Sequence, residues 1–171
     1  NITTAINMVG DINRLRPHVK THKCAEVAAM MIDAGIYKFK CATIAEAEML
    51  GMVNAKDVLL AYQPIGPKLK RFIQLIKKYP ATQYSCLTDN LLSAAEQSDA
   101  FNAAGLKVPV YIDLNVGMNR TGISPGDKAL ELYKYCSSAP GLEIKGLHAY
   151  DGHSRNANLD EKKKEVDQTF L

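Results

Sequence analysis

Features that define several protein classes are missing from this chain of 171 residues. Its longest apolar stretches, such as the one around Val58–Ala61, fall far short of the ~20 residues that a membrane helix needs. It contains neither the Gly-x-Gly-x-x-Gly pattern nor the Walker-type loop of nucleotide-binding proteins. With 11 glycines and 7 prolines, its composition excludes collagen-like and disordered classes. We therefore expect a soluble domain of enzyme size, with no membrane partner.

The net charge and the cysteine content limit the binding partners and the cellular compartment that we expect. The net charge is only +3 and no long basic run occurs, so nucleic acid is not an expected partner. The four cysteines form no Cys-x-x-Cys pair and have the wrong spacing for structural zinc: Cys24, Cys41, Cys86 and Cys136. Cys41 and Cys86 lie in apolar runs, which predicts small buried thiols in a reducing compartment. With no secretory leader at the start, this predicts a cytoplasmic protein.

Short β-type segments alternate with helix-type segments along the whole chain. The predicted strands are Arg16–His22, Tyr37–Ala42, Asp57–Gln63, Thr82–Leu87, Val108–Val116 and Leu142–Tyr150. The predicted helices are Asn1–Asn13, Ala25–Ala34, Ile44–Met52, Lys68–Lys78, Leu91–Ala104, Lys128–Ser137 and Asp160–Leu171. Because parallel strands need crossovers, the alternation predicts an α/β fold with a parallel sheet. Periodicity alone does not choose between a doubly wound sheet and part of a (β/α)₈ barrel.

The first predicted strand has a polar face. Side chains alternate along a strand, so Arg16, His18, Lys20 and His22 are expected on one side. An edge strand facing water is one interpretation. A metal site is a second, but strand positions four apart are separated by about 13 Å, whereas zinc lies ~2 Å from each ligand. We therefore expect no metal site at His18 and His22.

A lysine nucleophile is the third interpretation of this segment. The neighbouring histidines and arginine would lower the pKa of Lys20 by repulsion, and burial would act in the same direction. A neutral amine at the carboxyl end of a strand is what Schiff-base chemistry with a carbonyl cofactor requires. Lys20 is therefore the predicted catalytic residue.

Two later strands carry polar groups at their carboxyl ends. One face of Val108–Val116 is aliphatic, and the other carries Tyr111, Asp113 and Asn115. Arg120 follows in a loop between glycines, where it either reaches an anionic oxygen or lies on the surface. The last predicted strand places Gly146, His148 and Tyr150 on one side, where Tyr150 either contacts an aromatic cofactor or packs in the core.

Three motifs together resemble one enzyme family. They are Arg16-Pro17-His18-Val19-Lys20-Thr21-His22-Lys23, then Ile112-Asp113 with Gly117-Met118-Asn119-Arg120-Thr121-Gly122, and Gly146-Leu147-His148-Ala149-Tyr150-Asp151-Gly152-His153. In this order they resemble the D-threonine aldolase and D-serine dehydratase family. These are pyridoxal-phosphate enzymes with an alanine-racemase-like N-terminal barrel. The segment Ala149–His153 is closer to the aldolases.

The resemblance implies a role for each matching residue. Lys20 would carry pyridoxal phosphate as a Schiff base, and Arg120 would approach the phenolic oxygen of the cofactor. Tyr150 would line the cofactor where alanine racemases have a histidine. His18 and His22 would be neighbours of Lys20 that tune it.

The resemblance also implies that the chain is part of a longer protein. The family barrel is a (β/α)₈ TIM-type barrel, of which about six units are expected here. Residues 1–171 would be the N-terminal pyridoxal-phosphate-binding barrel domain. The remaining strands, the phosphate-binding loops and a C-terminal β domain would follow. The ligands of a divalent metal (Zn, Mn or Mg) near the substrate hydroxyl are expected there too, in the full-length protein.

The sequence therefore predicts a lyase that acts on D-β-hydroxy amino acids and is a homodimer. Its first candidate reaction is that of a D-threonine aldolase, which splits D-threonine into glycine and acetaldehyde. A D-serine dehydratase, an amino-acid racemase, a non-catalytic protein that buffers pyridoxal phosphate and a structural α/β domain are the alternatives. The residues quoted above do not separate the aldolase from the dehydratase.

Overall fold

The computed structural model describes residues 1–170, which contain one five-stranded parallel sheet. Its strands are β1 (Lys38–Cys41), β2 (Asp57–Leu60), β3 (Gln83–Thr88), β4 (Val108–Leu114) and β5 (Leu142–Ala149). Their order in the sheet is their order in the chain, and every neighbouring pair is parallel. A doubly wound sheet reverses its strand order, whereas a barrel adds each strand beside the previous one. The order therefore confirms the prediction of an incomplete barrel.

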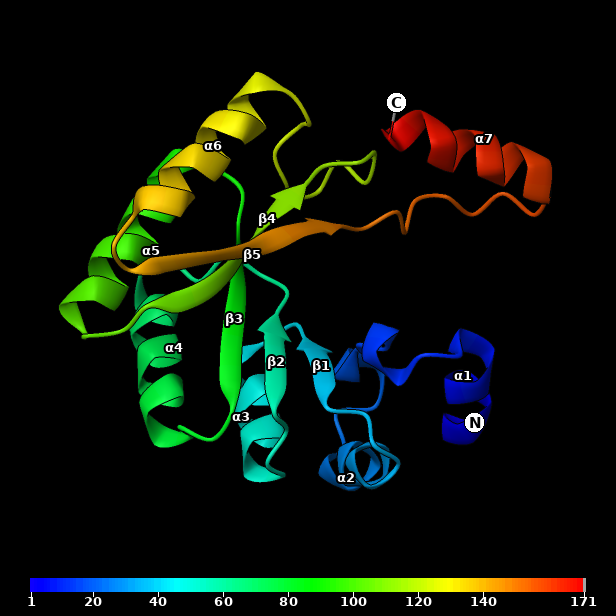
Figure 1. Cartoon of the computed structure of the whole chain (residues 1–171), viewed down its shortest axis with the longest axis horizontal. Helices are drawn as coiled ribbons and strands as arrows, with labels where there is room; N and C mark the ends of the chain where they lie inside the picture. The colour runs from blue at the N-terminus through cyan, green and yellow to red at the C-terminus, as the bar shows by residue number, and fades with distance from the viewer. Residues whose placement is uncertain (171) are drawn as a thin grey trace.

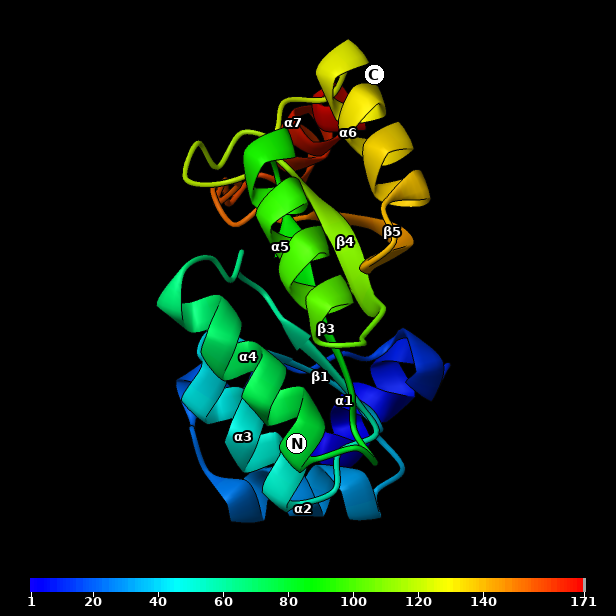
Figure 2. The same ribbon diagram turned by 90° about the vertical axis from the view of Figure 1, so that its left-hand side faces the viewer.

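The helices lie mainly on one side of this sheet. They are α1 (Ile2–Val9), α2 (Ala25–Asp33), α3 (Ile44–Met52), α4 (Pro67–Lys78), α5 (Leu91–Ala103), α6 (Asp127–Ser138) and α7 (Leu159–Phe170). Helices α3 to α6 cover one face, as Figure 2 shows, whereas α1 and α7 lie on the opposite side of the strands in Figure 1. Within residues 1–170, no helix has the length and apolarity to cross a bilayer.

The core lies between the strands and this helical layer. Phe72 of α4 packs edge-on against Tyr84 of β3, with ring centroids 6.3 Å apart, and against Phe101 of α5 at 6.2 Å. Cys41 and Cys86 are buried free thiols, as predicted. Burial raises the pKa of both thiols far above the usual range. These cysteines therefore act as small apolar side chains.

The first predicted strand, Arg16–His22, is wrong as a regular strand. Only a single bridge joins His18 to Lys40, with a hydrogen bond of 2.8 Å from the Lys40 amide to the Pro17 carbonyl. Residues Val19–Thr21 then form a turn of 3₁₀ helix, η2, in which the side chain of His18 accepts a hydrogen bond from the Lys20 amide. The ring of His18 thus competes with sheet pairing for a backbone donor and starts a helical turn. The alternation of faces expected along this segment is therefore lost.

The two terminal helices also differ from their predicted ranges. The predicted helix Asn1–Asn13 ends at Gly10, which has a φ of +75°, and a separate 3₁₀ turn, η1, follows at Ile12–Arg14. Only glycine adopts that backbone conformation without steric cost, so the helix ends there. The predicted helix Asp160–Leu171 corresponds to α7, and its last residue, Leu171, lies outside the described residues.

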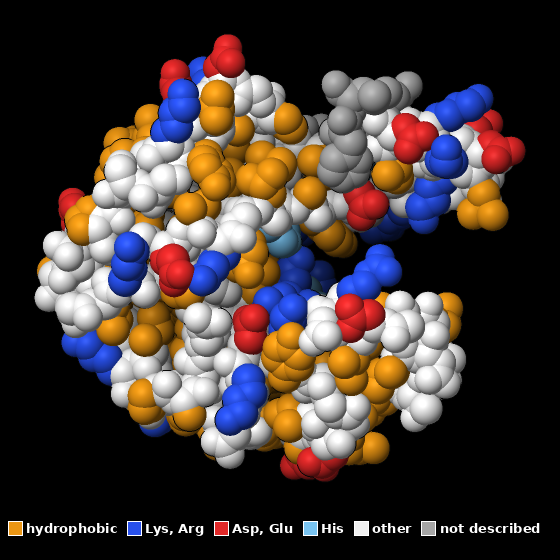
Figure 3. Space-filling view, in the orientation of Figure 1, with side chains coloured by type: hydrophobic (Ala, Val, Ile, Leu, Met, Phe, Trp, Pro, Cys, Tyr) orange, Lys and Arg blue, Asp and Glu red, His pale blue; other side chains and the backbone are white. Residues whose placement is uncertain are grey.

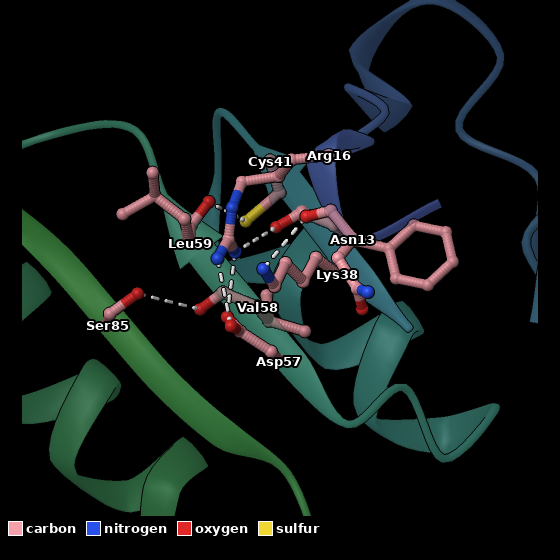
Figure 4. Close-up of polar contacts among 9 residues, drawn as sticks. Asn13, Arg16, Lys38, Cys41, Asp57, Val58, Leu59 and Ser85 are labelled. Carbon is pink, nitrogen blue, oxygen red and sulfur yellow. Dashed lines mark hydrogen bonds and ion pairs between the residues drawn. The ribbon is translucent and has the colours of Figure 1, made fainter. Parts of the chain in front are cut away.

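Arg16 connects the N-terminal segment to the sheet, as shown in Figure 4. Its Nη1 and Nη2 atoms donate to Oδ1 and Oδ2 of Asp57 at 2.7 and 2.8 Å, and Nη1 also donates to the Phe39 carbonyl at 3.2 Å. Both side chains of the pair are only 21% exposed. These bonds attach the segment before η2 to β2 through Asp57 and to β1 through the Phe39 carbonyl, and the two bonds to the carboxylate are charge-assisted. Arg16 therefore has a structural partner and does not share a polar face with Lys20, contrary to the prediction.

Replacing Asp57 by alanine is expected to lower the free energy of unfolding by about 1.5–3 kcal/mol, because the guanidinium of Arg16 loses two charge-assisted hydrogen bonds in a partly dry site. Urea unfolding measures the change. Lys78→Ala is the control, since it removes an ion pair with Glu48 whose side chains are 62% and 40% exposed. Water and salt screen such an exposed pair, so its loss should change the stability much less than the loss of Asp57 does. Equal losses in the two variants would contradict the role of Arg16.

Candidate active site

A cavity of about 290 Å³ opens at the carboxyl ends of the strands. Its lining comes from the N-terminal segment at η2, from all five strand ends and from the loops that follow them: His18, Lys20, Lys40, Ala42, Ala61, Tyr62, Leu87, Asp113, Leu114, Met118, Arg120, Thr121, His148 and Tyr150. The space-filling view in Figure 3 shows a hollow with Lys, Arg and His side chains gathered at its base. Because the carboxyl ends of parallel strands meet at one edge, this is where active sites of barrel enzymes lie.

Three cations surround one aromatic ring in this cavity. The Nζ atoms of Lys20 and Lys40 lie 5.7 and 5.5 Å from the centroid of Tyr150, and Cζ of Arg120 lies at 5.6 Å. Each distance is within the range of cation–π attraction. Among the described residues, none of the three forms an ion pair with a carboxylate. The cavity therefore has an excess of positive charge that suits an anionic, aromatic ligand.

The loop after β4 positions Arg120. Its two ends are tied together by hydrogen bonds of 2.9 Å from the Asn115 amide to the Ile123 carbonyl and from the Ile123 amide to the Asp113 carbonyl. Inside the loop, Oδ1 of Asn115 accepts from the amides of Gly117 and Asn119 at 3.2 and 3.0 Å. These bonds replace the ladder contacts that the backbone loses on leaving the sheet. Arg120 is thus held at the cavity although it lies in a loop.

A series of hydrogen bonds that starts at Lys40 links β1, β5 and β4. Nζ of Lys40 lies 2.7 Å from Nε2 of His148, and Nδ1 of His148 lies 2.6 Å from Oδ1 of Asp113. The other carboxylate oxygen of Asp113 accepts from Thr121 Oγ1 at 2.9 Å and from Gln63 Nε2 at 3.3 Å. The side chains of His148 and Asp113 are only 14% and 5% exposed. This series of hydrogen bonds is therefore shielded from water at its carboxylate end.

The environment changes the pKa values of Asp113 and Lys40, the two ends of this series of hydrogen bonds. Burial alone would raise the pKa of Asp113, but hydrogen bonds from His148 and Thr121 hold it below its usual value. Burial lowers the pKa of Lys40, and the positive charge of Lys20 adds to that effect. Asp113 is thus ionised, and the ammonium form of Lys40 is disfavoured relative to a lysine in water.

The structure brings together four of the five side chains predicted at the cofactor. Lys20, His18, Arg120 and Tyr150 line the cavity, whereas His22 lies outside it. Nδ1 of His22 instead accepts a hydrogen bond of 3.1 Å from the Cys24 amide at the start of α2. Lys20 lies on η2 and is exposed, so its expected burial on a strand is wrong. The catalytic role assigned to Lys20 stays a prediction.

Lys40 also lines the cavity, although the sequence did not lead us to predict a role for it. It alternates with buried Phe39 and Cys41 on β1, so its side chain points to the opposite face of the sheet. A lysine on a half-buried face of a parallel strand is costly unless it has a polar partner. This unfavourable position, a lysine between two apolar residues of a predicted strand, could have identified Lys40 from the sequence. Among residues 1–170, no three His, Cys, Asp or Glu side chains converge to hold a metal.

Comparison with known proteins defines the class. Residues 1–170 match the family model of the alanine racemase N-terminal domain, and the chain belongs to this family. It is 30% identical to a D-threonine aldolase of Arthrobacter sp. over 153 residues, which cover 89% of this chain and 40% of the relative. It is 29% identical to a 3-hydroxy-D-aspartate aldolase of Paracoccus denitrificans over 153 residues, covering 88% of this chain and 39% of the relative.

A solved structure agrees with these relatives. The crystal structure of a D-threonine aldolase from Filomicrobium marinum superimposes with a TM-score of 0.89 at 30% identity, covering 98% of this chain and 46% of that one. The chain therefore spans less than half the length of the relatives it matches. The resemblance to the D-threonine aldolase group predicted from the three motifs is confirmed.

Gly117→Ala is expected to destabilise the loop that carries Arg120. A Cβ at this position would collide with the His153 ring, and the backbone has a φ of +113°. Gly126→Ala is the matched control, because its φ is +133° but the added Cβ meets nothing. Both variants should lose about 1–3 kcal/mol through backbone strain. Faster hydrogen exchange of amides 117–122 is expected in Gly117→Ala alone, and equal exchange in the two variants would contradict the packing of His153 on Gly117.

The stability of the protein is expected to fall as the pH drops from 6.5 to 4, in part through His18. Burial, followed by the charges of Lys20 and Lys40, lowers the pKa of His18 from 6.5 to about 4. The unfolded chain therefore binds more protons in this window, so the contribution of neutral His18 is complete above pH 6.5 and lost towards pH 4. Urea unfolding at several pH values should give a smaller slope for His18→Asn, which retains an acceptor for the Lys20 amide. An unchanged slope would contradict the shift.

Proposed function

We propose that residues 1–171 are the N-terminal, pyridoxal-phosphate-binding barrel domain of a lyase that acts on D-β-hydroxy amino acids. The reaction is that of a D-threonine aldolase, which yields glycine and acetaldehyde from D-threonine. One observation carries the proposal: two lysines and an arginine surround the Tyr150 ring in a cavity at the strand ends. The similarity to D-threonine aldolases over nearly the whole chain supports the substrate class.

The side chains in the cavity fit pyridoxal phosphate by their chemistry. The cofactor is an aromatic aldehyde with a phenolic oxygen and a phosphate, so it needs an amine, cations and an apolar or aromatic wall. Lys20 supplies an accessible amine, Arg120 a guanidinium, and Tyr150 an aromatic ring. Leu87 and Leu114 add apolar surface. The one carboxylate in the lining, Asp113, is hydrogen-bonded to His148 and Thr121, and Lys20, Lys40 and Arg120 outnumber it.

Each residue then has a defined task. Lys20, whose side chain is exposed, would hold the aldehyde carbon of the cofactor. Arg120 would bind the phenolic oxygen, and Tyr150 would pack on the ring. When bound, the cofactor supplies an electron sink for the bond that breaks at Cα. A divalent metal that lowers the pKa of the substrate hydroxyl is proposed for the full-length protein, with ligands outside residues 1–170.

The remaining expectations belong to the same proposal. A homodimer and a cytoplasmic location remain predictions. The D-serine dehydratase, the racemase and the non-catalytic carrier of pyridoxal phosphate are distinguished by the products formed. Acetaldehyde identifies the aldolase, pyruvate the dehydratase and L-amino acid the racemase, whereas cofactor binding without any product identifies the carrier.

Reduction of the full-length protein with borohydride in the presence of pyridoxal phosphate should attach the cofactor to Lys20 and to no other lysine. Lys20→Ala is expected to lose the imine absorbance and to lower turnover of D-threonine by at least about 10³-fold, as loss of a catalytic nucleophile does. Peptide mapping and an acetaldehyde assay measure the two effects. EDTA should abolish turnover without removing the imine absorbance.

Lys23→Ala is the control for this variant, because Lys23 lies three residues further along the same segment and outside the cavity. It should keep both the absorbance and the turnover. Attachment of the cofactor at Lys40 would refute the assignment of Lys20.

A further inference from the structure

Attachment of a cofactor at Lys20 leaves a second lysine of the cavity without a task. Lys40 lies at the carboxyl end of β1, and its Nζ atom is 2.7 Å from Nε2 of His148. Both side chains line the cavity. A lysine that served only to attract an anion would have no need of an imidazole partner held by a buried carboxylate.

The carboxylate decides which nitrogen of His148 carries a hydrogen. Both oxygens of Asp113 accept hydrogen bonds, from His148 on one side and from Thr121 and Gln63 on the other. An ionised carboxylate only accepts, so Nδ1 of His148 must donate. Nε2 is then the atom that faces Lys40. The imidazole therefore presents its second nitrogen to the lysine in a defined orientation.

The short distance limits the pair to one shared positive charge. At 2.7 Å, Nε2 and Nζ form a hydrogen bond, so one of the two atoms must be the acceptor. An ammonium or a neutral amine can donate to a neutral imidazole, and an imidazolium can donate to a neutral amine. If the ammonium and the imidazolium were both present, Nζ and Nε2 would both be donors and neither could accept the hydrogen bond. One proton can thus lie at either end of the bond while Asp113 balances the charge.

Charged and titratable groups surround this pair from every element packed on it. They are Arg16, His18 and Lys20 from the N-terminal segment, Asp113 from β4, and Arg120 and Tyr150 from the loops. Arg16 is paired with Asp57, but the charges of Lys20, Arg120 and Arg16 all lower the pKa of Lys40, whereas Asp113 raises it. Burial of the Lys40 Nζ atom also lowers this pKa.

We propose that Lys40 is the proton donor of the reaction assigned to this cavity, with His148 and Asp113 as its positioning residues. This inference rests on the proposed function. When the Cα–Cβ bond breaks, its electron pair stays with Cα, and Cα takes a proton from Nζ of Lys40. The O–H electron pair of the β-hydroxyl forms the carbonyl of the aldehyde and releases one proton. Lys40 then takes up one proton from solvent, so atoms and charge balance.

The first test needs no turnover. In the full-length apoprotein with ¹³Cε-labelled lysine, the NMR signal that disappears in Lys40→Met should titrate below pH 10.5, the usual lysine value. Asp113→Asn should lower that midpoint further, because the negative charge of Asp113 raises the pKa of Lys40. A Lys40 signal that titrates at or above pH 10.5 would overturn the proposal.

The second test isolates the proton transfer. Exchange of the α-hydrogens of glycine in D₂O, followed by ¹H NMR on the loaded full-length enzyme, requires no C–C cleavage. Lys40→Met should slow this exchange by about 10²–10⁴-fold, the usual contribution of a general acid or base. Lys40→Arg should be equally slow, since a guanidinium keeps the charge but does not release its proton. Lys38→Met should leave the exchange unchanged.

The positioning role of His148 can be tested by the pH dependence of the rate. His148→Gln keeps a hydrogen-bonding side chain but does not titrate, so it should shift the alkaline limb of the pH–rate profile rather than remove activity. In the unsubstituted enzyme that limb should fall below pH 10.5. An unmoved limb in His148→Gln would overturn the coupling.

Different results would contradict the proposed function and the donor role of Lys40. If borohydride does not attach pyridoxal phosphate to Lys20 in the unsubstituted protein, both the proposed function and the donor role of Lys40 are wrong. If Lys20 is labelled but Lys40→Met or Lys40→Arg exchanges glycine hydrogens at the full rate, only the donor role is wrong.

Discussion

A single buried carboxylate, Asp113, balances a cavity whose other charges are positive. Without it, His148 would have no acceptor for Nδ1, and Lys40 would face Lys20 and Arg120 with no compensating charge nearby. Its own ionisation is maintained by three donors, His148, Thr121 and Gln63, which come from three different parts of the chain. The arrangement of the cavity thus depends on bonds to one side chain that only the folded barrel can assemble.

The order of the strands explains how so many groups meet. Each crossover returns the chain to the same edge of the sheet, so the carboxyl ends of β1, β4 and β5 open on one cavity although Lys40 and His148 are 108 residues apart. The helices cover the opposite face and bury Phe72, Phe101 and the thiols. One face of the strands therefore packs against the helices, and the other face carries polar side chains of the cavity.

Much of this could be predicted from the sequence because it depends on local patterns. Alternating apolar positions located β1 to β5, and the polar residues Asp113, His148 and Tyr150 were expected at strand ends. The segment at Lys20 could not be predicted, because the His18 ring bonds the Lys20 amide and turns an extended pattern into a 3₁₀ turn. Lys40 was missed because its partners are distant in the sequence, and a lone lysine in a short strand has no motif around it.

The burial of the cysteines has a practical consequence for spectroscopy. Cys41, Cys86 and Cys136 are enclosed in the core, and the loss of solvation keeps their thiols protonated. Cys24 alone is partly accessible, and it follows Lys20 by only four residues in the chain. Within residues 1–171, a thiol-reactive fluorophore or spin label would therefore attach beside the N-terminal segment of the cavity, and its signal would report movements of that segment as ligands arrive.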